Sequence, residues 1–145
     1  MQFLKQCLLR SLCLAVFLFV GAVSAGEVTG SDASKIKVAC VGDSITQGSG
    51  FPGQLQKLIG DGFEVQNFGH SGRPLLNRGD NPYTKSPRFQ AALEFNPDVV
   101  IIKLGTNDSK SHNWRQKKGF IPDYLRLISR FRQLPSKPVV WICKP

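Results

Sequence analysis

The amino-acid sequence predicts an α/β protein with an open parallel sheet and helices on both faces. Short apolar segments typical of buried strands alternate with segments whose apolar residues recur at helical spacing, in the order β-α-β-α-β-α-β. The connections are short, and such strand–helix–strand units form right-handed crossovers between parallel strands. A ligand site in a sheet of this kind lies beyond the carboxyl ends of the strands.

Residues 1–25 are predicted to be a signal peptide. Lys5 and Arg10 precede an apolar stretch over residues 11–23, and residues 23–25 are the small residues that a signal peptidase reads. The competing interpretation is a membrane anchor, but the apolar stretch is shorter than the roughly 20 residues that span a bilayer. We therefore expect a secreted or periplasmic protein with no stable membrane insertion after cleavage.

Length and composition indicate one folded domain or less. The chain has 145 residues, of which 41% are hydrophobic and 20% charged, which suits a globular protein. Its formal charge of +9 falls to +7 without the signal peptide, which holds two basic residues and no acidic one. Such a charge attracts nucleic acid, anionic polysaccharide or membrane surfaces. The basic residues are scattered along the sequence, however, so we favour a solvated basic face and expect no nucleic-acid partner.

The domain is expected to cover residues 36–145, after a flexible, polar lead-in over residues 26–35. An apolar run over residues 37–41 predicts the first strand. A helix is predicted over residues 52–59, with a proline in its first turn, where proline is tolerated. Its apolar residues at helical spacing are Leu55, Leu58 and Ile59.

A second strand, a long loop and a second helix follow. Residues 63–68 alternate between apolar and polar, as in a strand. The loop over residues 69–82 is rich in glycine and proline and is long enough to be functional. Ser86 can cap a helix that has Pro87 at its first position, so we expect this helix over residues 86–95.

The last part of the chain predicts a strand, a polar loop, the clearest helix and a final strand. Residues 98–104 contain a continuous apolar run, typical of a strand buried on both faces. A polar loop over residues 105–118 leads to a helix over residues 120–134 with one apolar stripe. Residues 139–143 form a second strand of the buried type. Two cysteines, Cys40 and Cys143, lie within strands and are expected to act as small buried hydrophobes.

Candidate catalytic groups follow the first three strands. Ser44 lies in a turn of small residues at the end of a strand, where a serine hydroxyl is lifted and accessible, as a nucleophile must be. Gly69 begins the second loop, and glycine lets a backbone N–H approach a ligand closely. Asn107 in the third loop carries an amide donor. The N–H groups of Ser44 and Gly69 and the Asn107 amide can together stabilise an oxyanion.

These residues resemble the SGNH, or GDSL, hydrolase family. Gly42-Asp43-Ser44 is similar to its first block, Gly69 to its second, and the stretch from Gly105 to Asp108 to its third, so the resemblance extends over residues 35–143. It implies a flavodoxin-like three-layer fold, with Ser44 as the nucleophile and Gly69 and Asn107 as oxyanion-hole donors. The third block, followed by Ser109-Lys110, resembles the carbohydrate-esterase or sialate O-acetylesterase-like branch. That branch implies small O-acyl or O-acetyl esters of carbohydrate as substrates, and lipid and aryl esters remain open.

One block of the family is missing. The family takes its general base and orienting acid from an Asp-x-x-His near the C-terminus, but this chain has only His70 and His112, and neither has an aspartate three residues before it. The apolar segment over residues 139–143 also has nothing after it to cover one edge, which is an aggregation hazard. We therefore expect a hydrolase domain that is incomplete at its C-terminus.

Other residues receive weaker assignments. His70, Arg73 and Trp114 are candidates for contact with the substrate, although solvated loop charge is the competing interpretation for Arg73. Asp43 and Asp108 are expected to accept hydrogen bonds that fix their loops. No cluster of histidine, cysteine and carboxylate has metal-ligand spacing, so neither a metal nor a cofactor is expected.

Two other function classes remain open. The chain can be an inactive remnant or a glycan- or anion-binding module that keeps the oxyanion pocket without turnover. It can also be a flavodoxin-like nucleotide or phosphate binder, but it has no glycine-rich phosphate loop of known spacing. The interpretation that we favour is an exported serine esterase.

Overall fold

The computed structural model describes residues 34–144. The predicted signal peptide and the lead-in up to residue 33 lie outside the described residues. Within residues 34–144, no helix has both the length and the apolar character that a membrane span requires.

The sheet is fully parallel, as predicted. Its spatial order is β2-β1-β3-β4, and the strands are β1 (Ile36–Gly42), β2 (Phe63–Gly69), β3 (Val99–Lys103) and β4 (Val139–Ile142). Gly42 pairs with Gly69 on one side and with Lys103 on the other, so the carboxyl ends of β1, β2 and β3 are level. The three loops that carry the candidate catalytic groups therefore leave the same edge of the sheet.

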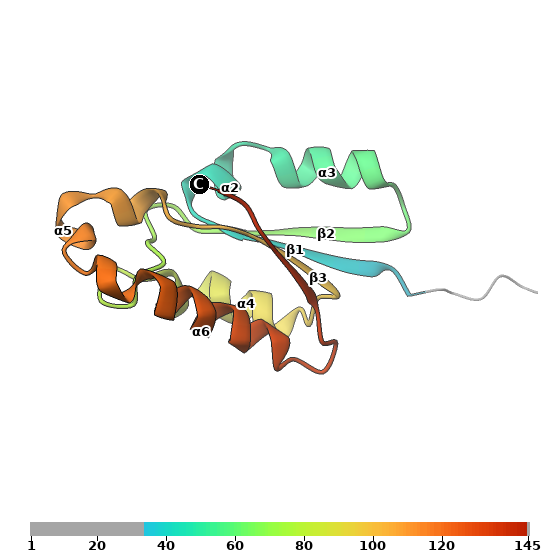
Figure 1. Cartoon of the computed structure of the whole chain (residues 1–145). Helices are drawn as coiled ribbons and strands as arrows, with labels where there is room; N and C mark the ends of the chain where they lie inside the picture. Colours follow the sequence, from blue (N-terminus) through green and yellow to red (C-terminus); the bar gives the residue numbers. More distant parts are fainter. Residues whose placement is uncertain (1–33, 145) are drawn as a thin grey trace, which may run out of the picture. The chain divides into compact units, whose positions relative to one another are not determined.

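Helices cover both faces of the sheet, which confirms the three-layer prediction (Figure 1). One face carries α3 (Phe51–Ile59), and the other carries α4 (Pro87–Glu94) and α6 (Phe120–Arg132). As expected, the Ser86 hydroxyl caps α4 by accepting the Phe89 N–H at 3.2 Å.

The predicted apolar face of α3 is wrong at one position. Leu58 is 84% exposed, whereas Leu55 and Ile59 are half-buried and Pro52 is buried. At about 100° per residue, Pro52, Leu55 and Ile59 fall on one side of the helix and Leu58 falls well to the side of that face. The three-residue spacing between Leu55 and Leu58 therefore does not put Leu58 on the buried side of the helix.

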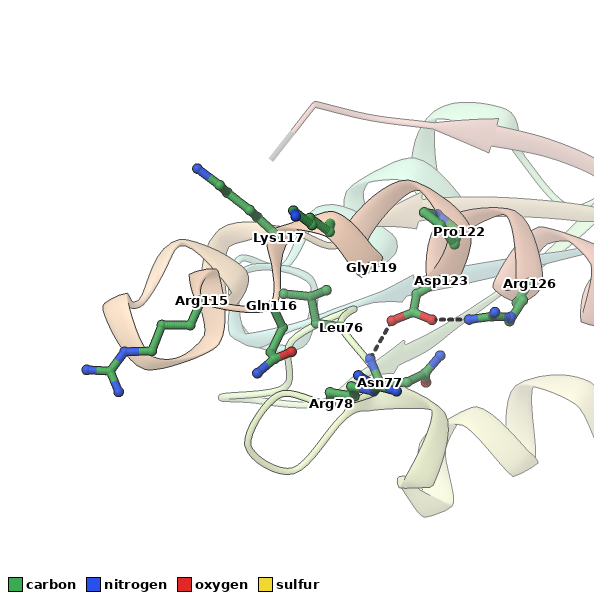
Figure 2. A pocket seen from close by; sticks show the side chains of 11 residues that line it. Leu76, Asn77, Arg78, Arg115, Gln116, Lys117, Gly119, Pro122, Asp123 and Arg126 are labelled. Carbon is green, nitrogen blue, oxygen red and sulfur yellow. Dashed lines mark hydrogen bonds and ion pairs between the residues drawn. The ribbon is translucent and has the colours of Figure 1, made fainter.

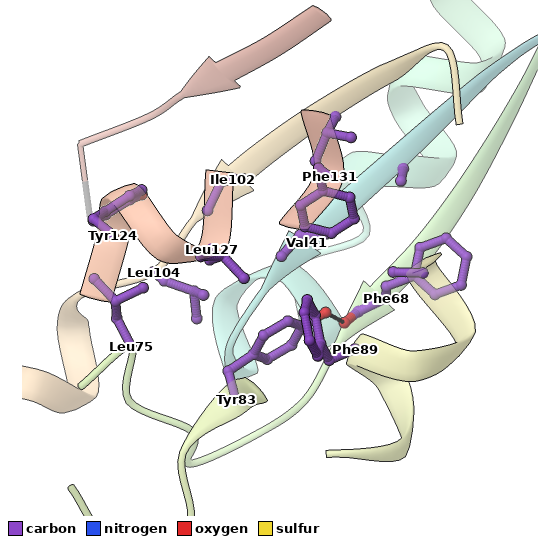
Figure 3. Packing of buried hydrophobic residues seen from close by; sticks show 13 residues of the cluster. Val41, Phe68, Leu75, Tyr83, Phe89, Ile102, Leu104, Tyr124, Leu127 and Phe131 are labelled. Carbon is purple, nitrogen blue, oxygen red and sulfur yellow. Dashed lines mark hydrogen bonds between the residues drawn. The ribbon is translucent and has the colours of Figure 1, made fainter. Parts of the chain in front are cut away.

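The core lies between the sheet and the α4–α6 face (Figure 3). Val41 and Ile102 project from the central strands, and Phe89 and Phe131 from the two helices pack edge-to-face at 5.9 Å between ring centroids. By contrast, β4 is an edge strand whose Trp141 side chain is 64% exposed, although its apolar sequence is typical of a strand buried on both faces.

The loops contain short elements that the sequence did not predict. They are α2 (Ser44–Gly48), η1 (Tyr83–Lys85), η2 (Thr106–Ser109), α5 (Ser111–Trp114) and η3 (Lys117–Gly119). Three of them lie within or next to the predicted polar loop over residues 105–118. Each is too short for an apolar periodicity to emerge.

Candidate active site

Ser44 lies where the sequence predicts it, at the first position of α2 and directly beyond β1. Asp43 is the N-cap of α2, and one of its carboxylate oxygens accepts the Ile45 N–H at 3.0 Å. Asp43 is buried while Ser44 is exposed, so a fixed turn presents the serine to solvent. Gly42 has to be glycine, because a Cβ there would lie 2.7 Å from the Lys103 carbonyl oxygen and would collide with Thr46.

Asn107 is joined to this turn through the second oxygen of Asp43. Its Nδ2 lies 3.3 Å from Asp43 Oδ2 and 3.4 Å from the Arg73 carbonyl oxygen, and its side chain is buried. The structure therefore brings Asn107 and the Ser44 turn together. Both distances exceed the usual 2.9–3.0 Å of an N–H···O bond, so neither bond holds the amide tightly.

The second loop gives a different result for Gly69. Its N–H donates to Asn67 Oδ1 at 2.9 Å and is therefore already engaged. A Cβ on Gly69 would lie 2.7 Å from the Cα of Gln47, so glycine is required there for the close approach of β2 to α2. The geometry gives Gly69 a packing role, and its predicted role as an oxyanion donor stays a prediction.

Gly72, three residues later, has the features expected of a donor. Its φ of +75° favours glycine, and its N–H has no acceptor within residues 34–144. The neighbouring Ser71 N–H donates to Gln47 Oε1 on α2 at 2.7 Å, and the neighbouring Arg73 carbonyl accepts from Asn107. Gly72 therefore lies between the helix that begins with Ser44 and the Asn107 amide. The sequence signal for this donor is the second glycine of Gly69-His70-Ser71-Gly72.

Asp108 fixes the long second loop to the third, which confirms the expectation for this residue. It is fully buried, and it accepts the N–H groups of Leu75 and Leu76 at 2.9 and 2.8 Å. Burial raises the pKa of the Asp108 carboxyl, and these two bonds oppose that shift without cancelling it. Since Asp108 follows Asn107 in the chain, its bonds also position the candidate oxyanion donor.

Two supporting residues were missed in the sequence. Asn113 is 1% exposed; its Nδ2 donates to the Asn107 carbonyl at 2.9 Å, and its Oδ1 accepts the Asp80 N–H at 2.8 Å. The Tyr83 hydroxyl donates to the Phe68 carbonyl at 2.7 Å inside the core (Figure 3). Neither residue carried a signal, because a lone asparagine in a polar loop and a lone tyrosine beside a proline are common.

Neither histidine is placed as a ready base. Arg73 Nη2 lies 3.5 Å from His70 Nε2, and since arginine only donates, this nitrogen is the acceptor. Partial burial, together with the positive charges of Arg73 and Arg88, lowers the pKa of His70. His112 is exposed and pairs with Asp80 at 3.1 Å.

The other two candidate substrate contacts have structural partners. Arg73 Nη1 donates to the Asn81 carbonyl at 3.2 Å, so Arg73 connects the two ends of the second loop. Trp114 is 45% exposed and packs edge-to-face on Phe120 at 6.0 Å. Over residues 34–144, no three histidine, cysteine or acidic side chains gather closely enough to hold a metal ion.

Comparisons with known proteins place the chain in a family. Residues 40–145 match the GDSL-like lipase/acylhydrolase family. An acetylxylan esterase of Xylanibacter ruminicola is 47% identical over 111 residues, which cover 71% of this chain and 23% of that protein. The chain therefore spans about a quarter of the length of this relative.

Two solved structures have a similar fold. The inhibitor-bound aryl esterase of M. smegmatis superposes with a TM-score of 0.60 at 21% identity, over 76% of this chain and 64% of that structure. A carbohydrate acetylesterase family member from Sinorhizobium meliloti gives a TM-score of 0.56 at 26% identity, over 76% of this chain and 62% of that structure.

Proposed function

Since the chain belongs to the GDSL-like lipase/acylhydrolase family, we propose that it is part of an exported serine esterase that removes small O-acyl groups, O-acetyl groups above all, from carbohydrate. The observation that carries this proposal is the Asp43 carboxylate. One of its oxygens caps the turn that presents Ser44, and the other lies 3.3 Å from the amide nitrogen of Asn107. The acetylxylan esterase and the carbohydrate acetylesterase among its relatives support the substrate class.

In the proposed reaction, Ser44 Oγ attacks the ester carbonyl carbon and the carbonyl oxygen becomes an oxyanion. The C–O bond of the ester then breaks, and the departing sugar oxygen takes up the proton that the Ser44 hydroxyl lost. Water later attacks the acyl-serine, which releases the carboxylic acid and restores the Ser44 hydroxyl. We assign the oxyanion to the Ser44 N–H and the Asn107 amide. From the second loop we assign the Gly72 N–H in place of that of Gly69, which Asn67 occupies. Each such donor typically accounts for about 10²–10³-fold in kcat.

We further propose that the general base and its orienting acid come from an Asp-x-x-His segment that this sequence does not contain. His70 and His112 are both engaged elsewhere. An apolar groove of about 370 Å³ lies between α6 and the end of β4. Ile121 and Leu125, which line this groove, are 64% and 62% exposed, which suits a surface that a further segment covers.

Hydrolysis of an aryl acetate and of acetylated xylan by the wild-type chain and by Ser44→Ala tests the proposal. We expect the aryl acetate activity to fall at least about 100-fold in Ser44→Ala, and we expect the natural coding extension, where it supplies Asp-x-x-His, to raise the wild-type rate. Turnover that Ser44→Ala leaves unchanged would overturn the assignment of the nucleophile.

The alternative is a non-catalytic module that binds glycans or anions. It is favoured for this chain because His70 and His112 both have other partners. This alternative predicts no turnover even with the extension, but retained binding of acetylated oligosaccharide by both the wild-type chain and Ser44→Ala.

A further inference from the structure

A second hollow, distinct from the Ser44 turn, lies between the long second loop and the start of α6 (Figure 2). Its volume is about 470 Å³. The basic side chains around it come from three segments of the chain and are Arg78, Arg115, Lys117, Lys118 and Arg126. We call this hollow the basic pocket.

The only acidic residue among those that line the basic pocket is Asp123, and its carboxylate is already bonded on both sides. One oxygen accepts the Asn77 N–H at 2.9 Å and the other accepts from Arg126 at 2.7 Å (Figure 2). Burial acts to raise the pKa of Asp123, but the bonds from Asn77 and Arg126 outweigh it and lower that pKa, so the carboxylate is ionised.

The remaining cations have no compensating charge. Within residues 34–144, none of Arg78, Arg115, Lys117 and Lys118 forms an ion pair. Five basic residues against one acid leave the lining with a formal charge of +4. The α6 helix, which spans 13 residues and has no side-chain cap at Gly119, begins at the same pocket and adds the positive end of its dipole.

The basic pocket is joined to the proposed catalytic site. Leu76, which lines it, donates its N–H to Asp108, the residue after Asn107. Leu76 is also only three residues from Arg73, whose carbonyl contacts the Asn107 amide, so their Cα atoms are at most about 11 Å apart. A glycan that occupies both sites has to span the second loop that lies between them.

We propose that the basic pocket binds the carboxylate of an acidic sugar, a uronic acid, in the same glycan whose ester the Ser44 site cleaves. This rests on the proposed function, because a carbohydrate substrate makes a uronate the expected anion. Arginine and lysine side chains bind carboxylates through charge-assisted hydrogen bonds, and arginine does so bidentately. The pocket would thereby select acidic over neutral glycan esters.

Binding measured on the Ser44→Ala chain keeps this inference separate from catalysis. The probes are D-glucuronate, D-glucose and inorganic phosphate, and the measurement is the Kd by calorimetry or by NMR shifts at low salt. The pocket variant is Arg115→Gln/Lys117→Gln/Lys118→Gln. The matched control, Arg132→Gln/Lys57→Gln/Lys85→Gln, removes the same three charges at exposed positions away from the pocket.

We expect glucuronate to bind more tightly than glucose or phosphate, with a Kd that rises at least 10-fold in the pocket variant and less than twofold in the control. Equal losses in both variants, or no measurable glucuronate binding, would overturn the inference. Phosphate binding as tight as glucuronate binding would overturn the assignment to a sugar acid. If glucuronate binds as expected but no acetate ester is hydrolysed, only the proposed function fails.

Discussion

Replacing Asp108 with asparagine tests whether one buried carboxylate holds the site loops together. Asp108 is fully buried, and its two oxygens accept the N–H groups of Leu75 and Leu76 at 2.9 and 2.8 Å. Asparagine has nearly the same shape but keeps only one acceptor oxygen. The substitution therefore places an NH₂ group against a backbone N–H and leaves that buried donor without a partner.

The expected loss follows from these two bonds. A hydrogen bond to a charged group contributes about 1.5–3 kcal/mol, and a buried unpaired donor costs about 1–3 kcal/mol. Since relief from burying a charge offsets part of this, we expect the free energy of unfolding of Asp108→Asn to fall by about 2–3 kcal/mol at neutral pH. For a domain of this size, the Tm should fall by about 8–12 °C.

The pH dependence of the loss is a sharper test. A carboxyl whose pKa is raised in the folded protein adds stability that is fully present below its ordinary pKa and is lost as the pH rises through the folded-state pKa. Burial raises the pKa of Asp108 in this sense. The wild-type chain loses this contribution to its free energy of unfolding as the pH rises above the ordinary pKa of a carboxyl group. The asparagine variant has no such carboxyl and loses nothing. The stability gap between them should therefore be largest in acid and smaller at neutral pH.

Urea unfolding followed by circular dichroism from pH 3 to pH 8 measures the gap. Asp98→Asn is the matched control, because Asp98 also accepts one backbone N–H, from Lys37 at 2.8 Å, but is exposed. We expect it to cost less than about 1 kcal/mol. Equal losses in the two variants, or a gap for Asp108→Asn that widens with rising pH, would refute the reasoning from burial.

Three further substitutions have distinct expected outcomes. Gly69→Ala should lower the free energy of unfolding by more than about 2 kcal/mol, because the new Cβ would collide with the backbone of α2. The control is Gly53→Ala, where a Cβ meets nothing within 4 Å. In the same urea series, this control should leave the free energy of unfolding unchanged or raise it. Tyr83→Phe should cost about 1–2 kcal/mol through its lost buried hydrogen bond, and an unchanged Tm would contradict this. Asn107→Ala should lower kcat on an aryl acetate about 10²–10³-fold where the chain turns over, and a change confined to KM would argue against an oxyanion role.

The strands could be predicted from the sequence because a short run of residue types is enough to indicate a strand. Residues 99–102 are a run of β-branched side chains, which suits a strand covered on both faces and hardly fits another element. The order of the strands and the neighbours of each strand in the sheet could not be predicted in this way. They depend on which segments pair across the sheet. An apolar sequence does not distinguish a strand in the centre of the sheet from a strand at its edge.

The site was predictable only in its separate parts. Ser44 and Asn107 became candidates because each follows a recognisable strand. The bond that joins them, through Asp43, spans 64 positions in the sequence, so no local pattern contains it. The choice between Gly69 and Gly72 depends on a single side chain, Asn67, which occupies one N–H.

The basic pocket shows how scattered charges become one feature. Its cations are spread from Arg78 to Arg126, and the sequence alone favoured a solvated basic face. They line one pocket because two buried acids hold three consecutive N–H groups of the second loop: Asp108 binds those of Leu75 and Leu76, and Asp123 binds that of Asn77. The loop that positions the Arg73 carbonyl beside the Asn107 amide therefore also forms one wall of the pocket. A change that frees this loop should disturb the proposed oxyanion site and the basic pocket together, whereas a change to Arg115, Lys117 or Lys118 should leave the proposed oxyanion site intact.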